Sequence, residues 1–472
     1  MQSLVTLLHG MSWGWNLWTV LSLASDLLAL ATAPSILLRR RSQPLPALGW
    51  LLAVFALPLV GAGWWWMVGR SKLERRRRDR QGARADLCAL AEPEAGGRLA
   101  CCDESGEAGP APWRRGGTTR LVVDGPAVYG AFDQLIEGAG SSLELMFYIW
   151  RDDRSGRRFR DLLAARAAEG VEVRVLVDAV GAAGLPRRFW APLEDAGGHV
   201  GRFQPPRLLR RGFDLNLRNH RKLVIADGTR AWVGGLNIGD EHLGAWHDLG
   251  VVVEGGTVGD LREVFLDDWF FATDEGRLPD ATAAQPDSGG ARARVVASGP
   301  DEPENSTRAT LFDTICEADG RVWLMTPYFA PDLAMLEALC GAARRGADVR
   351  VLLPADGFTV GDRLACLASR AYWERLLGSG VRLFLHLRGF AHAKAALFDT
   401  TALIGSANYD ERSLRLNFEL GILVEDDALV ESLRRLIARD CEEARELSRD
   451  DPDRGGIDAL VSSAAHLLSP ML

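Results

Sequence analysis

The stretch NHRKLVIAD at residues 219–227, followed by GGLN at 234–237, decides the fold of this chain because a second copy lies further on. The second copy reads AHAKAALFD at 391–399 and is followed by GSAN at 405–408. Each copy contains H-x-K-x4-D, and the histidines, lysines and aspartates of the two copies are 172 positions apart. The offset is 171 for the glycines and asparagines. Two copies in register indicate an internal duplication.

The same succession of elements precedes each copy. The expected strand, helix and strand lie at 142–149, 159–169 and 170–177, and again at 322–325, 333–345 and 346–353. Such units favour mostly parallel sheets covered by helices. The sequence therefore predicts an α/β protein with two duplicated lobes, 118–290 and 291–450, related by a pseudo-twofold axis and sharing one site.

Two apolar runs lie near the N-terminus, at 17–38 and 47–68, each 22 residues long. About 20 apolar residues cross a bilayer, and Asp26 is the only ionisable residue in either run. Tryptophans cluster at the start of the first run and the end of the second, as indole rings favour the membrane interface. Residues 1–80 are therefore predicted to be a membrane anchor with two transmembrane helices.

The basic residues beside these runs predict the orientation. Arg39–Arg41 lie between the runs, whereas seven Lys/Arg lie at 70–80, so the second flank is expected in the cytoplasm. The lobes would then face the cytoplasm from the inner membrane, with the N-terminus on the same side. The cluster Arg75–Arg78 is either a stop-transfer signal or a site for anionic headgroups.

Two segments lie outside the anchor and the lobes. Residues 81–117 are rich in Gly, Ala, Pro and charge without a sustained period, which predicts a linker. Residues 451–472 contain an amphipathic stretch at 457–468. It either docks on the lobes, which is the preferred interpretation, or lies on the membrane interface.

Charge and cysteines exclude some functions. Residues 1–80 carry a net charge of +7 and the whole chain −8, so the remainder is at −15, which argues against a nucleic-acid partner. The seven cysteines form no C-x-x-C pair and no Cys/His cluster with metal spacing. We therefore expect neither a metal nor another cofactor.

The motif residues suit chemistry on a phosphodiester. Side chains alternate along a strand, so His220 and Lys222, and likewise His392 and Lys394, lie on one face. Lysines neutralise phosphate oxygens, and Asn237 and Asn408 can donate amide hydrogen bonds to them. One imidazole can attack phosphorus while the other protonates the leaving oxygen.

Other residues are expected to support this pair. A nucleophilic imidazole needs a partner that fixes its tautomer, and Asp248 and Glu419, 171 positions apart, are the candidates. Gly235 and Ser406 would let substrate approach the backbone. Asp227 and Asp399 are expected to close the turn after each strand. The unmatched histidines are interpreted as surface or supporting residues: His242, His247 and His386.

These segments resemble the phospholipase D superfamily, and within it the bacterial cardiolipin synthases. The likeness includes Pro46–Leu52, Asn219–Gly244, Thr326–Asp332 and His392–Glu419. It implies two membrane helices, a duplicated domain, and transfer of a phosphatidyl group between two phosphatidylglycerol molecules through a phosphohistidine. The catalytic residues would be His220, Lys222, Asp227, His392, Lys394 and Asp399.

One departure concerns the second motif, where five residues separate Asp399 from Gly405 and the first motif has six. A tighter turn after Asp399 is expected. His220 is preferred as the nucleophile because its motif is undisturbed.

The acceptor alcohol stays open. A phosphatidyl-histidine can be resolved by water, by a lipid hydroxyl or by another alcohol, and the membrane anchor favours transfer. A nuclease and an inactive scaffold are the other classes considered. Interspersed arginines between the strands either bind anionic headgroups or form a solvated loop: Arg202, Arg207, Arg210, Arg211, Arg218 and Arg221.

Overall fold

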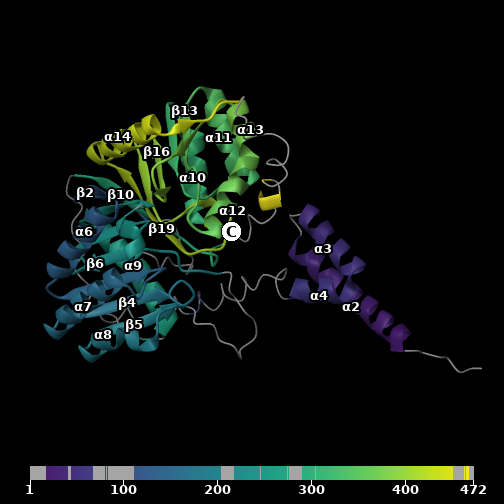
Figure 1. The fold of residues 1–472 in the computed structure, drawn as a ribbon, viewed down its shortest axis with the longest axis horizontal. Coiled ribbons are helices and arrows are strands. Elements are labelled where there is room, and N and C mark those ends of the chain that lie inside the picture. The colour runs from purple at the N-terminus through teal and green to yellow at the C-terminus, as the bar shows by residue number, and fades with distance from the viewer. Residues whose placement is uncertain are drawn as a thin grey trace, which may run out of the picture. The chain divides into compact units, whose positions relative to one another are not determined.

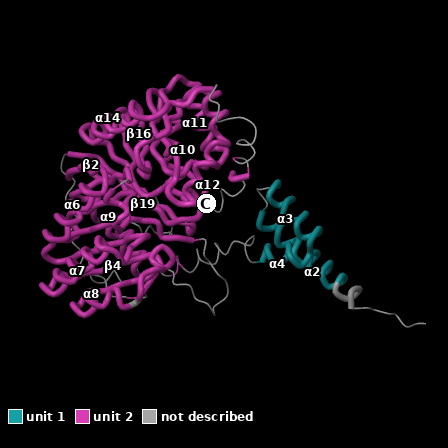
Figure 2. The backbone as a smooth tube through the Cα atoms, in the orientation of Figure 1, with its two compact units in different colours: residues 1–76, 210–212 teal, residues 77–209, 213–472 magenta. Residues whose placement is uncertain are grey.

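The fold is that of a computed structural model of the 472-residue chain. It describes residues 17–40, 44–66, 80, 82, 111–203, 217–244, 246–273, 275, 290–302, 304–449, 462 and 464–466. The chain divides into two compact units (Figure 2). We call residues 1–76 with 210–212 the N-terminal unit, and residues 77–209 with 213–472 the α/β unit.

The described residues of the N-terminal unit form the helices α2 (Leu17–Arg39), α3 (Pro44–Ala56) and α4 (Pro58–Trp64) (Figure 1). By length and composition, α2 is the one described helix that could cross a membrane. The helices share a small apolar core in which Trp65 packs edge-on against Trp50. The Trp65 indole also donates to Ser35 Oγ at 3.3 Å.

The predicted second span is interrupted at Pro58. Proline has no N–H and disfavours helical backbone at the preceding residue, and Leu57 accordingly has φ −135° and ψ 73°. The two helices then lie against each other, because a Cβ on Gly61 would be 2.4 Å from the carbonyl oxygen of Ala53. Residues 47–66 therefore fold back on themselves and do not form one continuous helix; 67 and 68 lie outside the described residues.

The first lobe of the α/β unit is built on a seven-stranded sheet of order β2-β9-β7-β6-β3-β4-β5. These strands are β2 (Thr119–Val123), β3 (Ser142–Phe147), β4 (Glu172–Asp178), β5 (His199–Phe203), β6 (Leu223–Ala226), β7 (Arg230–Gly234) and β9 (Leu249–Glu254). Its helices are α6 (Gly125–Glu137), α7 (Arg154–Ala168), α8 (Ala191–Asp195) and α9 (Thr257–Thr273).

The second lobe repeats this order as β10-β19-β17-β16-β11-β13-β14, within a nine-stranded sheet. These strands are β10 (Arg292–Ser298), β11 (Arg321–Met325), β13 (Asp348–Pro354), β14 (Arg382–His386), β16 (Ala395–Phe398), β17 (Ala402–Gly405) and β19 (Glu419–Glu425). Its helices are α10 (Ser306–Glu317), α11 (Leu333–Arg345), α12 (Val360–Ser369), α13 (Trp373–Gly378) and α14 (Asp427–Glu443). The repeated order agrees with a duplication.

The faces of the two sheets contribute to different cores. Alternate residues of each strand point to opposite faces, so Leu143 and Leu145 pack with α6 and α7, while Met146 packs with α9. The face that carries Met146 belongs to one apolar core shared by both lobes, with α9 from the first lobe and α14 from the second. The lobes therefore fold against each other over a common interior.

The expectation of mostly parallel sheets was wrong. The parallel pairings are β3–β4 and β4–β5 in the first lobe, and β11–β13 and β13–β14 in the second. The other pairings between the strands of each lobe are antiparallel. One cause is the short connection after each H-x-K strand, which makes β6 with β7 and β16 with β17 an antiparallel hairpin. Mixed sheets result, with a βαβα part joined to an antiparallel part.

The tighter turn in the second motif is confirmed. In the first lobe Ala226 pairs with Arg230 across three residues, of which Asp227 and Gly228 have positive φ. In the second lobe Phe398 N bonds to Thr401 O at 2.8 Å across only two residues. The deletion thus lies at the end of β16 remote from His392, so it gives no reason to prefer His220 as the nucleophile.

The segments flanking the lobes differ partly from expectation. Two residues of the predicted linker form β1 (Arg114–Arg115), which pairs with β10, whereas 83–110 lie outside the described residues. Arg80, placed with the basic flank, is buried in the α/β unit among Asp267, Asp268 and Asp301. In the C-terminal segment, the described His466 packs against Tyr372, with ring centroids 5.1 Å apart.

Candidate functional site

The two motifs occupy equivalent places in the lobes. His220 and Lys222 lie directly before β6, and His392 and Lys394 directly before β16. These strands lie near the middle of their sheets, and the histidine ends of both meet where the lobes join. Both lysines and His392 are buried, and His220 is nearly so.

Two short parallel pairings join the lobes beside the histidines. β15 (Phe390–Ala391) of the second lobe pairs with β8 (Trp246–His247) of the first, and Asn219 pairs with Phe418. The backbone N of His392 donates to His247 O at 2.8 Å, and that of His220 donates to Phe418 O at 2.9 Å. His392 therefore lies beside Asp248, the residue after His247, and His220 lies beside Glu419, the residue after Phe418.

Those following residues are Asp248 and Glu419, and each serves the histidine of the opposite lobe. His392 Nδ1 lies 2.7 Å from Asp248 Oδ2, and His220 Nδ1 lies 3.0 Å from Glu419 Oε2. Both carboxylates are fully buried. The structure thus places both carboxylates beside the imidazoles, in an exchanged arrangement that the sequence did not reveal.

Ser406 and Gly235, two residues expected to contact substrate, lie beside these carboxylates. Ser406 Oγ donates to Glu419 Oε2 at 2.5 Å, and Asn417 Nδ2 donates to the other oxygen at 3.1 Å. In the first lobe a Cβ on Gly235 would lie 2.4 Å from Asp248 Oδ1. Gly235 therefore leaves the room that the Asp248 carboxylate occupies.

The two motif asparagines are both buried. Asn237 Oδ1 accepts from the backbone N of Ile149 at 3.0 Å. The Asn408 side chain bonds to Asp410, and its Oδ1 accepts no hydrogen bond from the described residues. Contact of either amide with a substrate remains a prediction.

The lysines are held by the backbone of their own motifs. Lys222 Nζ donates to His220 O at 2.7 Å, and Lys394 Nζ donates to His392 O. Burial lowers the pKa of both amines, that of Lys394 to about 8, with Asp248 and Glu419 opposing the effect of burial on Lys394. Two buried amines in one place suit a site that receives an anion.

The imidazoles share this electrostatic environment. Burial lowers the pKa of His220, and burial with the charges of Lys394, Lys222 and His220 takes that of His392 well below its usual value. Although burial raises the pKa of a carboxyl group, His220, Lys222 and Ser406 together lower that of Glu419. The histidine and lysine pairs therefore act on one another within a single site.

Asp227 and Asp399 lie at the other ends of β6 and β16, away from the imidazoles. Asp227 accepts from the backbone N of Gly140, Ser141 and Ser142 at 2.7–3.1 Å. Asp399 binds the equivalent backbone groups at 319–321. Both carboxylates fix the loop that leads into the adjacent strand, which suits the expected turn-closing role and places them outside the reacting group.

Aromatic residues near the imidazoles were not among the site residues predicted from the sequence. The Tyr148 ring lies 5.1 Å from that of His220, and the Trp246 ring 4.4 Å from that of His392. Phe390 adds a second ring at 5.8 Å from His392. Their positions in the sequence could have indicated them, because Tyr148 directly follows β3 and Trp246 lies two residues before Asp248.

The unmatched histidines are buried, which contradicts the surface alternative and leaves the supporting alternative. His242 packs on Trp246 at 4.6 Å, and burial lowers its pKa to about 3. His247 bridges the lobes, with Nδ1 2.7 Å from Asp124 and Nε2 2.8 Å from Asp440. Burial would lower the pKa of His247, but the two carboxylates raise it to about 10.

One of the interspersed arginines, Arg221, fits neither of the two expected roles. Arg221 is buried and donates to Asp268 at 2.7 Å and to Ser298 O at 3.1 Å. It is therefore structural and does not face a headgroup. Arg207, Arg210 and Arg211 lie outside the described residues.

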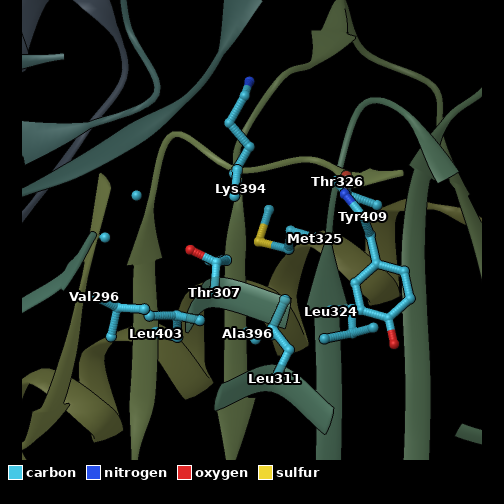
Figure 3. Close-up of a pocket in the computed structure, with 14 residues that line it drawn as sticks. Val296, Thr307, Leu311, Leu324, Met325, Thr326, Lys394, Ala396, Leu403 and Tyr409 are labelled. Atoms are coloured by element: carbon cyan, nitrogen blue, oxygen red, sulfur yellow. Dashed lines mark hydrogen bonds between the residues drawn. The ribbon is translucent and has the colours of Figure 1, made fainter. Parts of the chain in front are cut away.

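A cavity of about 30 Å³ lies beneath Lys394 in the second lobe, between the sheet and α10. Its lining is mainly apolar, and the Lys394 side chain points away from the other lining residues (Figure 3). This cavity is a gap in the core and holds none of the reactive atoms. In the described part of the chain, no three His, Cys, Asp or Glu side chains cluster as metal ligands would.

Comparisons with known proteins agree with this geometry. Residues 132–269 and 311–441 match the family model "Cardiolipin synthase, PLD-like domain". The chain is 38% identical over 364 residues to cardiolipin synthase A of Pseudomonas entomophila strain L48, covering 75% of this chain and 74% of the relative. It is 34% identical over 467 residues to cardiolipin synthase A of Pseudomonas fluorescens strain SBW25, covering 94% and 96%.

A solved structure shares the fold. The phosphatidylserine synthase of Haemophilus influenzae Rd KW20 superposes with a TM-score of 0.60 at 14% identity, over 77% of this chain and 97% of that one.

The exchanged carboxylates lead to a first prediction. Glu419→Gln and Asp248→Asn should each lower kcat by about 10²- to 10⁴-fold, because the imidazole loses the group that fixes its tautomer. Glu425→Gln is the matched control, since Glu425 lies at the remote end of β19 and pairs with Arg292. Full kcat in either buried-carboxylate variant, measured by steady-state kinetics, would show that these contacts do not support turnover.

The pKa of Lys394 leads to a second prediction. Because that pKa is about 8, the ammonium loses its charge as pH rises through this value, and kcat/KM should fall on the alkaline side. A guanidinium stays protonated there, so Lys394→Arg should remove this limb from the pH profile, whatever its absolute rate. An identical alkaline limb in the variant would assign the titration to another group.

Proposed function

The chain belongs to the cardiolipin synthase family of the phospholipase D superfamily, a family of phosphatidyltransferases, and we propose that it makes cardiolipin from two phosphatidylglycerol molecules. One phosphatidylglycerol would donate its phosphatidyl group, the other would accept it, and glycerol would be released. The observation that carries the proposal is the pair of imidazoles, each fixed by a carboxylate from the opposite lobe.

The reaction would run in two displacements at one phosphorus atom. Nε2 of one imidazole attacks phosphorus, the P–O bond to glycerol breaks, and the other imidazole gives its proton to the departing oxygen. The second imidazole then takes the proton from the glycerol hydroxyl of the second lipid, whose oxygen attacks phosphorus and frees the first imidazole. Atoms balance as two phosphatidylglycerols giving one cardiolipin and one glycerol.

Charge supports this chemistry. Lys222 and Lys394 would neutralise the non-bridging phosphate oxygens. The incoming anion would raise the pKa of whichever imidazole must be protonated, offsetting the lowering that burial causes.

The alternatives share these residues. Resolution by water would make the protein a phospholipase D-type hydrolase, and another alcohol would give a different phospholipid. A phosphodiesterase acting on nucleic acid fits less well because the chain beyond residue 80 has a net charge of −15.

The relatives imply a membrane-associated bacterial enzyme, and we propose that α2 anchors it in the inner membrane with the α/β unit in the cytoplasm. The sequence predicts a second crossing, but α3 has 13 residues, or about 20 Å, against a core of about 30 Å. The folded-back α3–α4 pair would enter and leave on the side where α2 ends. Both basic clusters, Arg39–Arg41 and 70–80, would then be cytoplasmic, as the positive-inside rule favours.

The proposed reaction is tested with purified protein in phosphatidylglycerol vesicles. Cardiolipin and glycerol should appear in equal amounts, and His220→Ala and His392→Ala should each abolish them. His199→Ala is the control because His199 is exposed on β5. A chelator should leave the rate unchanged. Phosphatidic acid as the sole lipid product would establish the hydrolase instead.

The membrane topology has its own test. In a variant without native cysteines, single cysteines at Ser3, Ser42 and Ser71 are probed with an impermeant maleimide in spheroplasts and in lysed cells. A re-entrant pair places Ser42 and Ser71 in the cytoplasm and Ser3 outside. Labelling of Ser42 alone in spheroplasts would establish two crossings.

A further inference from the structure

Exposed apolar side chains gather on one side of the candidate site. Among the described residues of the α/β unit, the large apolar side chains that are exposed are Leu243, Leu333, Phe358, Val360 and Leu387. Phe358 is 53% exposed, Val360 76% and Leu387 59%. Burying such side chains would be favourable, and a contiguous exposed patch marks an interaction surface.

Four of the five adjoin His392 through a wall of aromatic rings. Trp246 lies against the His392 ring at 4.4 Å, Phe358 stacks on Trp246 at 6.5 Å, and Phe358 reaches Phe390 at 5.7 Å. Val360 begins α12 just beyond Phe358, and Leu387 lies three residues before Phe390. Phe358 is therefore linked to the His392 imidazole through Trp246, and Val360 and Leu387 lie close to these rings along the chain.

Leu243 extends the patch from the first lobe. It ends a short helical turn, Asp240–Leu243, next to His242, whose ring packs on Trp246 at 4.6 Å. Loops of both lobes thus contribute to one surface, which we call the apolar rim: Leu243, Phe358, Val360 and Leu387.

The opposite side of the site is polar. The Tyr148 ring lies against His220, its hydroxyl bonds Arg218, and Arg412 lies near enough to Tyr148 and Arg218 for their charges to interact. The two sides can be compared residue by residue. Arg218 and Phe390 are 172 positions apart, so they occupy equivalent places in the two lobes. The two lobes have therefore diverged into a cationic half and an apolar half around one phosphorus position.

Charged residues fringe the apolar rim. Arg363 and Arg388 are largely exposed, and their ionic partners Asp356 and Glu443 are exposed to solvent as well. Exposed pairs of this kind are weak, so both guanidiniums can turn to phosphate groups. An apolar rim with basic residues at its edge matches the acyl and headgroup layers of an anionic leaflet.

We propose that the apolar rim inserts into the leaflet and that the wall of Trp246, Phe358 and Phe390 leads an acyl chain of the lipid to His392. The occupant is the acyl region of an anionic phospholipid bilayer. The proposal rests on the proposed lipid substrate and adds the face through which that substrate enters.

The test compares two physical forms of one substrate. Full-length protein carrying Val360→Ser and Leu387→Ser is assayed on phosphatidylglycerol in vesicles and on a monomeric short-chain phosphatidylglycerol. The ratio of the vesicle rate to the short-chain rate should fall by about ten-fold or more, because less apolar area enters the leaflet. Leu333→Ser, which removes a side chain 63% exposed at the start of α11, should leave this ratio at the wild-type value.

A second readout does not depend on turnover. An environment-sensitive fluorophore at Val360→Cys, in a variant without native cysteines, should shift to the blue on addition of phosphatidylglycerol vesicles, whereas the same label at Leu333→Cys should not. An unchanged rate ratio without a blue shift would overturn the docking surface while leaving the proposed function intact. A halved molecular mass of the Val360→Ser/Leu387→Ser variant would instead identify the rim as an interface between two copies of the chain.

Discussion

The exchange of carboxylates between lobes is the constraint on which the site depends. Neither motif is complete by itself, because His220 needs Glu419 and His392 needs Asp248. A short parallel pairing delivers each carboxylate, and the two pairings are equivalent under the duplication. The common apolar core beneath them holds the lobes in place. A functional site therefore exists only when both lobes are folded and docked.

Burial gives this arrangement its electrostatic character. Two lysines and two imidazoles face one another with two carboxylates between them, and burial disfavours charge on all the bases. An anion that binds there would stabilise the protonated forms of these bases. Buried pairs nearby, such as Arg221 with Asp268 and Arg80 with Asp267, are already neutralised and fix the scaffold.

The two lobes share the same backbone arrangement around the motifs, whereas some residues beside the histidines differ. The strand order, the carboxylate exchange and the Asp227 and Asp399 clamps repeat closely. The residues just before the motif histidines do not repeat, because Arg218 in the first lobe corresponds to Phe390 in the second. The frame of the site is therefore nearly symmetric, whereas the residues around it differ between the lobes.

The sequence by itself determined the duplication, the paired histidines and lysines, and the two candidate carboxylates, because a repeat with a constant offset is visible without coordinates. It also located the one-residue deletion after Asp399, since spacing fixes turn length. The tertiary structure alone decided which carboxylate serves which histidine, that Ser406 and Gly235 support carboxylates, and that the run after residue 47 folds back at Pro58. The reason is physical: spacing along a strand fixes the face of a side chain, whereas contacts between lobes depend on a docking geometry that no local pattern records.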